Sequence, residues 1–293
     1  MGRRSVVMFC VTQRQEDEMP ASVTPNGARV VRSDGALAGR VGLITGGGRG
    51  LGTEIASALL DAGAAVAVLG RDTGALAATC AALDPTGERM LPVTADVRDA
   101  DGVVRAVDRV RSELGRVDVL VNNSGIAGPT APLWESEPQE WRAAVETNLV
   151  GAAHCTRAVL PDMIDRRSGS VVFIGSMTGK RPLWGRTSYA ASKTGLIGLV
   201  RTLAAETGPF GIRVNLVSPG PIEGERIDRV LRAQAATRGI TAIEARSEML
   251  DDSPLGRLVR PADVAAVVAF LAGDGAAAIT GEDVNVSAGI VMY

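Results

Sequence analysis

Two side chains four residues apart have the chemistry of a proton-transfer pair. The run Ser-Tyr-Ala-Ala-Ser-Lys at residues 188–193 separates Tyr189 and Lys193 by four positions. Its alanines and the leucines that follow predict a helix, on which both side chains share one face. A free phenol has a pKa of ~10, and a neighbouring cation lowers that pKa by favouring the phenolate. The pair could therefore act as a general acid or base on a carbonyl or alcohol oxygen. The spacing also arises by chance, so this interpretation depends on the rest of the chain.

From residue 37 onward, short apolar runs alternate with segments of helical periodicity. Strands are expected at 41–45, 65–69, 90–95, 118–122, 170–174, 212–217 and 283–286. Helices are expected from the glycine loop through residue 60, at 74–83, 101–114, 138–166 (bent or broken within), over the segment that carries Tyr189 and Lys193, and at 261–271. Continuously apolar strands that alternate with helices are typical of a parallel sheet covered on both faces. The sequence therefore predicts an α/β fold, a single doubly wound Rossmann-type domain with a parallel sheet flanked by helices.

A glycine-rich loop, Thr-Gly-Gly-Gly-Arg-Gly-Leu-Gly at residues 45–52, joins the first expected strand to the first helix. A doubly wound sheet binds nucleotides at this point, because glycines admit a pyrophosphate and the helix N-terminus supplies N–H donors. We expect cofactor contacts from Gly46, Arg49, Gly50, Leu51 and Gly52. The spacing differs from the commonest dinucleotide fingerprint. A methyltransferase loop or a turn selected only for tight packing remains an alternative.

The end of the second expected strand bears on the choice of cofactor. Gly70 stands where an acidic residue would hold the ribose hydroxyls of NAD(H), and Arg71 follows it. Arg49 in the glycine loop could reach the same phosphate. Guanidinium groups pair well with phosphate, so NADP(H) is favoured over NAD(H). The alternative is that both arginines are solvated surface residues and that Asp72 neutralises Arg71.

Polar residues also follow the third and fourth expected strands. Asp96 could accept a hydrogen bond from an adenine amino group while Val97 packs against the ring. Asn123 and Gly125 follow the fourth strand at the same edge of the sheet, where ligands bind. Each of these residues could instead serve a turn or a helix cap.

Together with Asn148, Ser176 and Pro219-Gly220, these motifs resemble the short-chain dehydrogenase/reductase family, and in particular its 3-oxoacyl-reductase-like members. The resemblance covers residues 37–293. It implies an NADP(H)-dependent enzyme that interconverts a ketone or aldehyde with an alcohol. The hydride passes directly between the nicotinamide and the substrate carbon, and no metal takes part.

The resemblance also implies roles for single residues. Tyr189 would be the acid/base, and Lys193 would lower its pKa and hold the nicotinamide ribose. Ser176 would orient the substrate oxygen, and Asn148 would help to hold a water that relays protons through Lys193. Donors from tyrosine and serine can stabilise developing oxyanion charge without a metal.

The chain departs from the family pattern after Pro219, which the resemblance places against the cofactor. Gly224 stands where the family often has a threonine that contacts the nicotinamide carboxamide. Ile222 could still reach that group through its backbone. Ser124 replaces a frequent alanine, which is a small change. The missing threonine hydroxyl indicates a remodelled lid.

Residues 223–255 are expected to form a lid that closes over the substrate, because this region is long, charged and helical in pattern. The opposite wall is expected to include Lys180, Arg181 and Arg186, with Trp184 among them. Three cations near a pocket favour an anionic substrate such as a carboxylate, phosphate or sulfonate. Alternatively, these cations pair with acidic residues of the lid or face solvent.

Composition narrows the class of protein. The 293 residues carry a net charge of −2, so there is no basic footprint for nucleic acid, and no apolar run is long enough to span a bilayer. Three dispersed cysteines and the single His154 form no metal-binding pattern, and a cytoplasmic location is expected. Residues 1–36 are interpreted as a disordered extension without assigned function.

Two further expectations concern assembly and rival functions. The resemblance implies a homo-oligomer, a dimer or a tetramer, with alanine-rich helix faces near Ala152 and Ala191 allowing close packing. One rival is an NAD-dependent alcohol dehydrogenase of the same family. The other is a nucleotide-binding regulator without turnover, which would not need an activated phenol.

Overall fold

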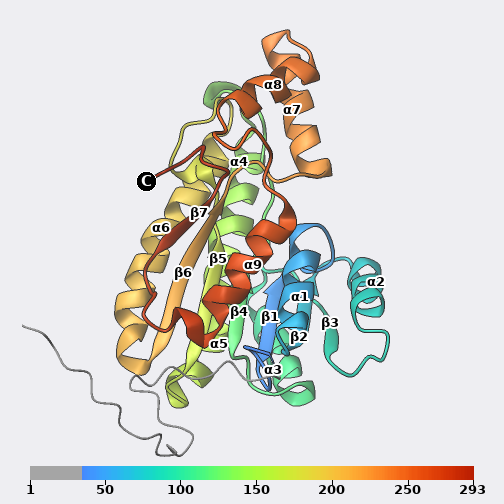
Figure 1. The fold of residues 1–293 in the computed structure, drawn as a ribbon, viewed down its shortest axis with the longest axis vertical. Coiled ribbons are helices and arrows are strands. Elements are labelled where there is room, and N and C mark those ends of the chain that lie inside the picture. The colour runs from blue at the N-terminus through green and yellow to red at the C-terminus, as the bar shows by residue number, and fades with distance from the viewer. Residues whose placement is uncertain (1–34) are drawn as a thin grey trace, which may run out of the picture. The chain divides into compact units, whose positions relative to one another are not determined.

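A computed structural model describes residues 35–293 of the chain, so the extension expected at residues 1–36 lies outside the described residues except for its last two. Seven parallel strands form one sheet in the order β3-β2-β1-β4-β5-β6-β7 (Figure 1). They are β1 (Val41–Thr45), β2 (Ala65–Gly70), β3 (Met90–Thr94), β4 (Val119–Asn122), β5 (Gly169–Ile174), β6 (Ile212–Pro219) and β7 (Asp283–Val286). All seven lie within two residues of the predicted bounds.

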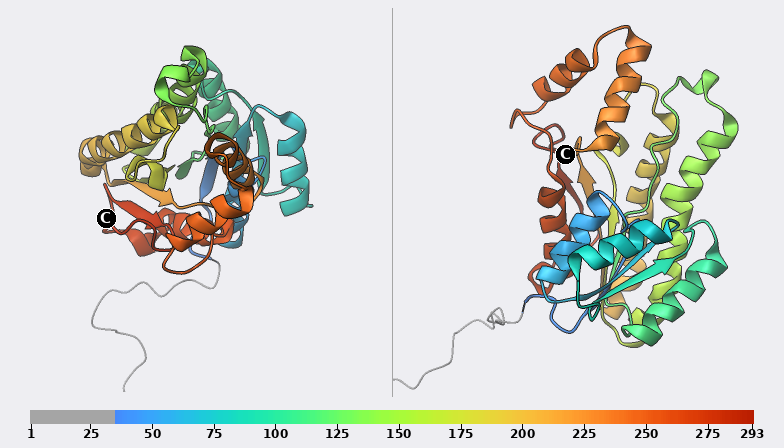
Figure 2. Two further views of the ribbon diagram at one scale, coloured as in Figure 1. Left: turned by 90° about the horizontal axis from the view of Figure 1, so that it is seen from above. Right: turned by 90° about the vertical axis from the view of Figure 1, so that its right-hand side faces the viewer.

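Helices cover both faces of the sheet, as predicted (Figures 1 and 2). They are α1 (Leu51–Asp61), α2 (Thr73–Leu83), α3 (Ala100–Glu113), α4 (Pro138–Val145), α5 (Gly151–Asp165), α6 (Thr187–Thr207), α7 (Glu225–Arg238), α8 (Ala242–Asp251) and α9 (Pro261–Ala272). Helices α1, α2 and α9 share one apolar core with the sheet, and α3, α5 and α6 share the other. The predicted doubly wound Rossmann-type fold is confirmed.

The double covering explains why the strands are apolar throughout. Leu43 and Ile44 are consecutive in β1 and are both fully buried, one in each core. Side chains of a strand alternate between faces, so a strand covered on both sides needs an apolar residue at every position. Each such side chain contributes about 1.5–3 kcal/mol when removed from water.

The long helix expected at 138–166 is interrupted, as its predicted bend indicated. Helix α4 leads into a π-helical turn, Glu146–Val150, which continues directly into α5. A π turn adds one residue per turn, so it changes the direction in which nearby side chains point, and such turns are frequent at functional sites. Asn148 lies within this turn and is buried.

The region expected to form a lid contains two packed helices. Leu231 and Ala235 of α7 pack with Ala245 of α8 in a small apolar cluster separate from the two main cores. Thr241 and Glu244 form a capping box at the start of α8, in which each side chain bonds to the other residue's backbone N–H. Within residues 35–293, no helix combines the length and apolarity needed to cross a membrane.

The strand order sets the place where a site can form. Strand β1 lies between β2 and β4, so the chain builds the sheet outward in two directions from this point. Because all strands are parallel, their carboxyl ends lie at one edge, and a crevice opens where the direction of winding changes. The glycine loop after β1 and the polar residues after β4 and β5 meet there.

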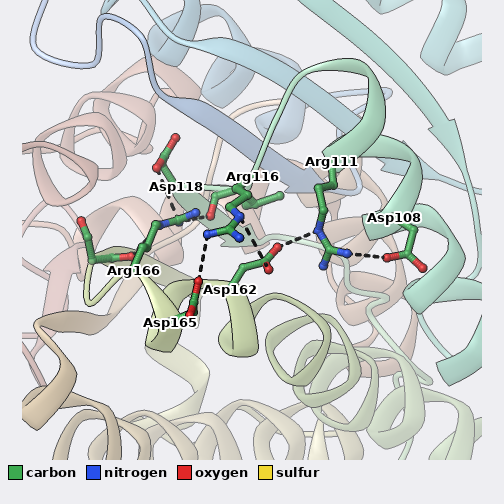
Figure 3. Close-up of polar contacts among 9 residues, drawn as sticks. Asp108, Arg111, Arg116, Asp118, Asp162, Asp165 and Arg166 are labelled. Atoms are coloured by element: carbon green, nitrogen blue, oxygen red, sulfur yellow. Dashed lines mark hydrogen bonds and ion pairs between the residues drawn. The ribbon is translucent and has the colours of Figure 1, made fainter.

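A network of ion pairs joins helices and a strand at the edge of the sheet opposite the carboxyl ends of the strands (Figure 3). Arg111 of α3 contacts Asp108 at 3.0 Å and Asp162 of α5 at 2.8 Å. Arg116 contacts Asp165 at 3.0 Å, and Arg166 contacts Asp118, which precedes β4, at 3.5 Å. The network therefore joins α3, α5 and the start of β4 away from the candidate site.

We expect Asp162→Asn to lower the free energy of unfolding by about 1 kcal/mol, because this carboxylate is largely shielded and lies near two arginines. Asp165→Asn serves as the control, since its side chain is 70% exposed and has one ionic contact. That change should cost only about 0.3 kcal/mol. Urea unfolding at low salt measures both values. If the Asp162 effect persisted undiminished in 1 M salt, where screening is strong, the electrostatic explanation would be wrong.

Candidate active site

Helix α6 places Tyr189 and Lys193 on one face, as their spacing predicts. The Lys193 ammonium is buried, and Nζ donates a hydrogen bond of 2.7 Å to the carbonyl oxygen of Ile174 at the end of β5. The same Nζ lies 5.7 Å from the centroid of the Tyr189 ring. The lysine is therefore fixed between the sheet edge and the phenol.

Two arginines also face the Tyr189 ring. The Cζ atom of Arg186 lies 4.9 Å from the ring centroid, and that of Arg226 lies 5.7 Å from it. Arg186 precedes α6 and was among the cations expected near the pocket, whereas Arg226 belongs to α7 and was not anticipated. The one sequence signal for Arg226 is its position near the start of the expected lid.

The environment of Tyr189 lowers the pKa of its phenol. Burial alone would raise this pKa, because it disfavours the charged phenolate. Four neighbouring groups together outweigh burial, and the Lys193 ammonium and the Arg226 guanidinium are the largest of these, because each stabilises the phenolate. The Ser176 hydroxyl and the Arg186 guanidinium act in the same direction. The pKa of the Lys193 ammonium is also lowered, first by burial, against the opposing effect of Tyr189.

Ser176 follows β5 and begins the 3₁₀ turn Met177–Gly179. Its side chain is half-buried, and Oγ accepts a hydrogen bond of 3.1 Å from the backbone N–H of Thr178. The Ser176 side chain also hydrogen-bonds the Tyr189 phenol, which places the hydroxyl beside the candidate acid/base.

Asn148 joins the loop after β4 to α6. Its Oδ1 accepts a hydrogen bond of 2.8 Å from the N–H of Ile126, and its Nδ2 donates to the Ile126 carbonyl and to Ser192 Oγ, each at 3.0 Å. Gly125 packs closely against this residue, because a Cβ there would lie 3.2 Å from Asn148 Oδ1 and 3.6 Å from Lys193 Nζ. The structure thus brings Gly125, Asn148 and Lys193 together.

The glycine loop is held in one shape by its neighbours. A Cβ on Gly52 would lie 2.2 Å from the carbonyl oxygen of Gly46, so no larger residue fits there. Asn123 Nδ2 donates hydrogen bonds of 2.9 Å to the Thr45 carbonyl and 3.1 Å to the Gly46 carbonyl. Gly50 precedes α1, and no side chain caps the helix that begins at Leu51. First-turn N–H groups of such a helix are available to an anion.

The two arginines expected to bind a phosphate lie at the same edge. Arg49 is exposed and pairs with Asp72 at 3.0 Å, while Arg71 is exposed at the end of β2. The ionic contact of Asp72 is thus with Arg49, and both arginines are exposed as the alternative interpretation expected. Asp72 also caps α2 by accepting from the N–H of Ala75 at 3.0 Å.

Asp96 and Val97 follow β3 as expected, but the carboxylate of Asp96 already has a partner. Arg98 donates to both its oxygens, with the shortest contact at 2.6 Å. These hydrogen bonds hold the pKa of the Asp96 carboxyl below its usual range. Val97 is buried, and its carbonyl oxygen lies 3.1 Å from Nδ1 of His154.

Beyond Pro219, which ends β6, the chain turns toward α7. Ile222 is half-buried and forms an isolated parallel bridge with Val259. Gly224 has a φ of 128°, a conformation that residues with a Cβ rarely adopt. This backbone explains why glycine stands where a threonine was expected.

Most of the expected cationic wall is neutralised. Lys180 lies 2.9 Å from a carboxylate oxygen of Asp283 and donates to Asn285 Oδ1 at 2.6 Å, and Arg181 pairs with Asp252 at 2.8 Å. Of the three predicted cations, Arg186 alone faces Tyr189. Within residues 35–293, no group of three or more His, Cys, Asp or Glu side chains could hold a metal ion.

The chain is similar to known proteins over most of its length. A protein-family model described as "Enoyl-(Acyl carrier protein) reductase" matches residues 46–291. The cis-4-hydroxycyclohexanecarboxylate dehydrogenase of Sinomonas cyclohexanicum is 37% identical over 254 residues, which cover 87% of this chain and 97% of that protein.

Two solved structures are similar in fold and sequence. An actinorhodin polyketide ketoreductase with NADPH matches with a TM-score of 0.83 and 36% identity, covering 87% of this chain and 98% of the other. A 3-oxoacyl-[acyl-carrier protein] reductase from Brucella melitensis, with bound NAD, matches with a TM-score of 0.78 and 32% identity, covering 94% and 99%.

The pKa of Tyr189 can be measured directly, because the chain has two tyrosines and the other is the terminal Tyr293. In a Tyr293→Phe background, ultraviolet absorbance follows the ionisation of Tyr189 alone. We expect Arg226→Met to raise this pKa, since the variant removes a cation that stabilises the phenolate. Arg229→Met, a change at an exposed residue of the same helix, is the control. An unchanged or lower pKa in the Arg226 variant would contradict the electrostatic explanation.

Proposed function

The chain belongs to the short-chain dehydrogenase/reductase family and is an NAD(P)-dependent oxidoreductase acting on carbonyl and alcohol groups. From this premise we propose that it uses NADP(H), with Tyr189 as the acid/base. The observation that carries the proposal is the phenol of Tyr189, which is set among three cations and has a lowered pKa. The cofactor, when bound, supplies or accepts the hydride.

The glycine loop fits a dinucleotide. The N-terminus of α1 lacks a side-chain cap, and a Cβ on Gly50 directly before it would meet no atom within 4 Å, so the backbone there is open to an anion. We assign the pyrophosphate contacts to Gly46, Arg49, Gly50, Leu51 and Gly52. The remaining cofactor contacts are assigned to Asp96, Val97, Asn123, Gly125, Tyr189, Lys193, Pro219 and Ile222.

The preference for NADP(H) is proposed from Arg49 and Arg71. Both side chains are exposed at the edge where the adenosine ribose would lie, and both could contact a 2′-phosphate. Arg49 would exchange its surface ion pair with Asp72 for the phosphate, and such exposed pairs are weak. NAD(H) is the rival cofactor, because similar proteins have been solved with NADPH and with NAD.

Catalysis is proposed to run through hydrogen-bond donors around the substrate oxygen. Tyr189 Oη would donate a proton to that oxygen during reduction and take it back during oxidation. Ser176 Oγ would donate a hydrogen bond to the same oxygen and fix its position. Donors arranged in advance stabilise developing negative charge at little reorganisation cost.

Lys193 and Asn148 would support this step. The Lys193 ammonium stabilises the phenolate that Tyr189 becomes after it gives up its proton. Asn148 already holds Ile126 and Ser192, so it fixes the loop after β4 against α6. We further propose that it helps to hold a water that restores the proton through Lys193.

The substrate is proposed to be a small carbonyl compound or alcohol that carries negative charge. Arg186 and Arg226 face the phenol without a carboxylate partner within residues 35–293. The similar dehydrogenase from Sinomonas cyclohexanicum is named for a substrate with a carboxylate. Residues 223–255, which include α7 and α8, would close over this substrate as a lid.

A homo-oligomer, either a dimer or a tetramer, is proposed for the assembly. Of the two alanines expected on packing faces, Ala152 is buried within the chain's own core and Ala191 is exposed on α6. The structure also shows a shallow apolar groove between α5 and α6. Its lining includes Ala153, Leu160, Ile164, Leu199 and Leu203.

We expect Tyr189→Phe to lower kcat by at least about a hundredfold, because the substrate oxygen loses its proton donor. Cofactor binding, followed by fluorescence titration, should stay within about threefold of the wild type, since the phenyl ring is retained. Tyr293→Phe is the matched control and should keep full activity. A nucleotide-binding regulator does not depend on the Tyr189 hydroxyl. If Tyr189→Phe left the activity of the protein unchanged, the enzymatic role of Tyr189 would be refuted.

Fluorescence titration with NADPH and NADH tests the cofactor assignment. We expect tighter binding of NADPH, and Arg71→Ala or Arg49→Ala should weaken it by about tenfold or more while barely affecting NADH. Arg109→Ala, on α3, controls for a general loss of surface charge. Tighter binding of NADH would contradict the NADP(H) assignment but leave the dehydrogenase activity in place.

A further inference from the structure

Two cations beside Tyr189 have no acidic partner in the part of the chain that the structure describes. Two other cations near the candidate site have acidic partners, because Lys180 pairs with Asp283 and Arg181 pairs with Asp252. Arg186 and Arg226 form no ion pair with any residue between 35 and 293. Two guanidinium groups therefore flank the proposed catalytic phenol with their charges uncompensated.

Arg186 is the fixed member of this pair. Its side chain is 3% exposed, and it donates to the Ala127 carbonyl at 2.9 Å and to Thr130 Oγ1 at 3.2 Å. Its Nε is buried and makes no hydrogen bond. An unsatisfied buried donor on an unpaired cation is unfavourable for the free protein, so a role in ligand binding explains its retention.

Arg226 is the adjustable member. It is exposed at the start of α7, and among the described residues its Nη1 donates only to the Gly125 carbonyl, at 3.4 Å, longer than a usual N–H···O bond. This weak contact can be exchanged for a stronger, charge-assisted one at little cost. The repulsion between Arg226 and Arg186 would also be relieved by an anion between them.

We propose that Arg226, together with Arg186, binds a carboxylate of the substrate and so determines which ketones or alcohols reach Tyr189. Arg186 already uses Nη1 to bond Thr130 and Nη2 to bond Ala127, so few of its N–H donors remain for a ligand. A carboxylate has two oxygens and needs fewer donors than a phosphate with three, so it is the better match. Since both guanidinium groups face the Tyr189 ring, this carboxylate lies only a few bonds from the reacting carbon.

The position of Arg226 also gives the lid a selective function. Because Arg226 lies on α7, a bound carboxylate draws this helix toward α6. A neutral ketone gains no such contact and leaves the two cations unpaired. The contact that recognises the substrate's carboxylate therefore also closes the lid, so the free energy of binding favours a charged substrate over a neutral one. This inference rests on the proposed function for the reaction itself.

The test compares 4-oxocyclohexanecarboxylate with its neutral carboxamide as substrates, at saturating cofactor. We expect the wild type to prefer the carboxylate by about tenfold or more in kcat/KM. Arg226→Met should remove this preference by raising KM for the carboxylate by about tenfold, whereas KM for the carboxamide should change less than about threefold. Any loss of kcat through the raised pKa of Tyr189 should be the same for both substrates. Arg226→Lys should restore part of it, because charge is kept while the planar fork is lost.

Arg229→Met provides the matched control. Arg229 is exposed on the same helix and has no hydrogen bond or ion pair with residues 35–293. Its replacement should leave both substrates unaffected. If Arg226→Met lowered kcat/KM equally for the carboxylate and the carboxamide, or if the wild type preferred the carboxamide, the proposal would be overturned while the reductase activity stood.

Calorimetric titration of 4-oxocyclohexanecarboxylate into the complex with NADP⁺ separates binding from turnover. Weaker binding in Arg226→Met by about tenfold, with Arg229→Met like the wild type, supports the carboxylate site even if neither ketone is reduced. In that case the proposed reaction would be wrong, but the carboxylate site would still be supported. Equal affinity in the wild type and Arg226→Met, or no binding by either, overturns the carboxylate site.

Discussion

The buried ammonium of Lys193 is the constraint on which the candidate site depends. A charge removed from water is unfavourable by several kcal/mol unless it is hydrogen-bonded or paired. Lys193 is stabilised by the Ile174 carbonyl at the end of β5 and by the Tyr189 phenol beside it. Both partners require α6 to lie firmly on the sheet, so the fold and the chemistry of the site depend on the same contact.

The surroundings of Lys193 fix its position from several directions. Gly125 lets the loop after β4 approach, and Asn148 ties that loop to Ser192 on α6. Asn148 belongs to a π-helical turn that interrupts an otherwise regular helix, and this turn lies directly at the site. Local departures from regular structure are frequent at functional positions, because they re-aim single side chains.

The lid differs from the rest of the fold in how it is stabilised. Helices α7 and α8 pack around a small apolar cluster outside the two main cores, and α7 carries Arg226 to the phenol. Segments with few buried apolar contacts open at low free energy. A cation on such a segment can join or leave the site without unfolding the sheet, which suits a residue that contacts substrate.

The sequence by itself determined the strands, the glycine loop, the family and the Tyr189–Lys193 pair, because these follow from periodicity and short spacings. Only the tertiary structure decided which charges stay unpaired. Arg181 finds Asp252 and Lys180 finds Asp283 across more than seventy residues, and Arg226 reaches Tyr189 from another helix. Local patterns carry no information about such partners, since the distance between them is set by how the helices pack on the sheet.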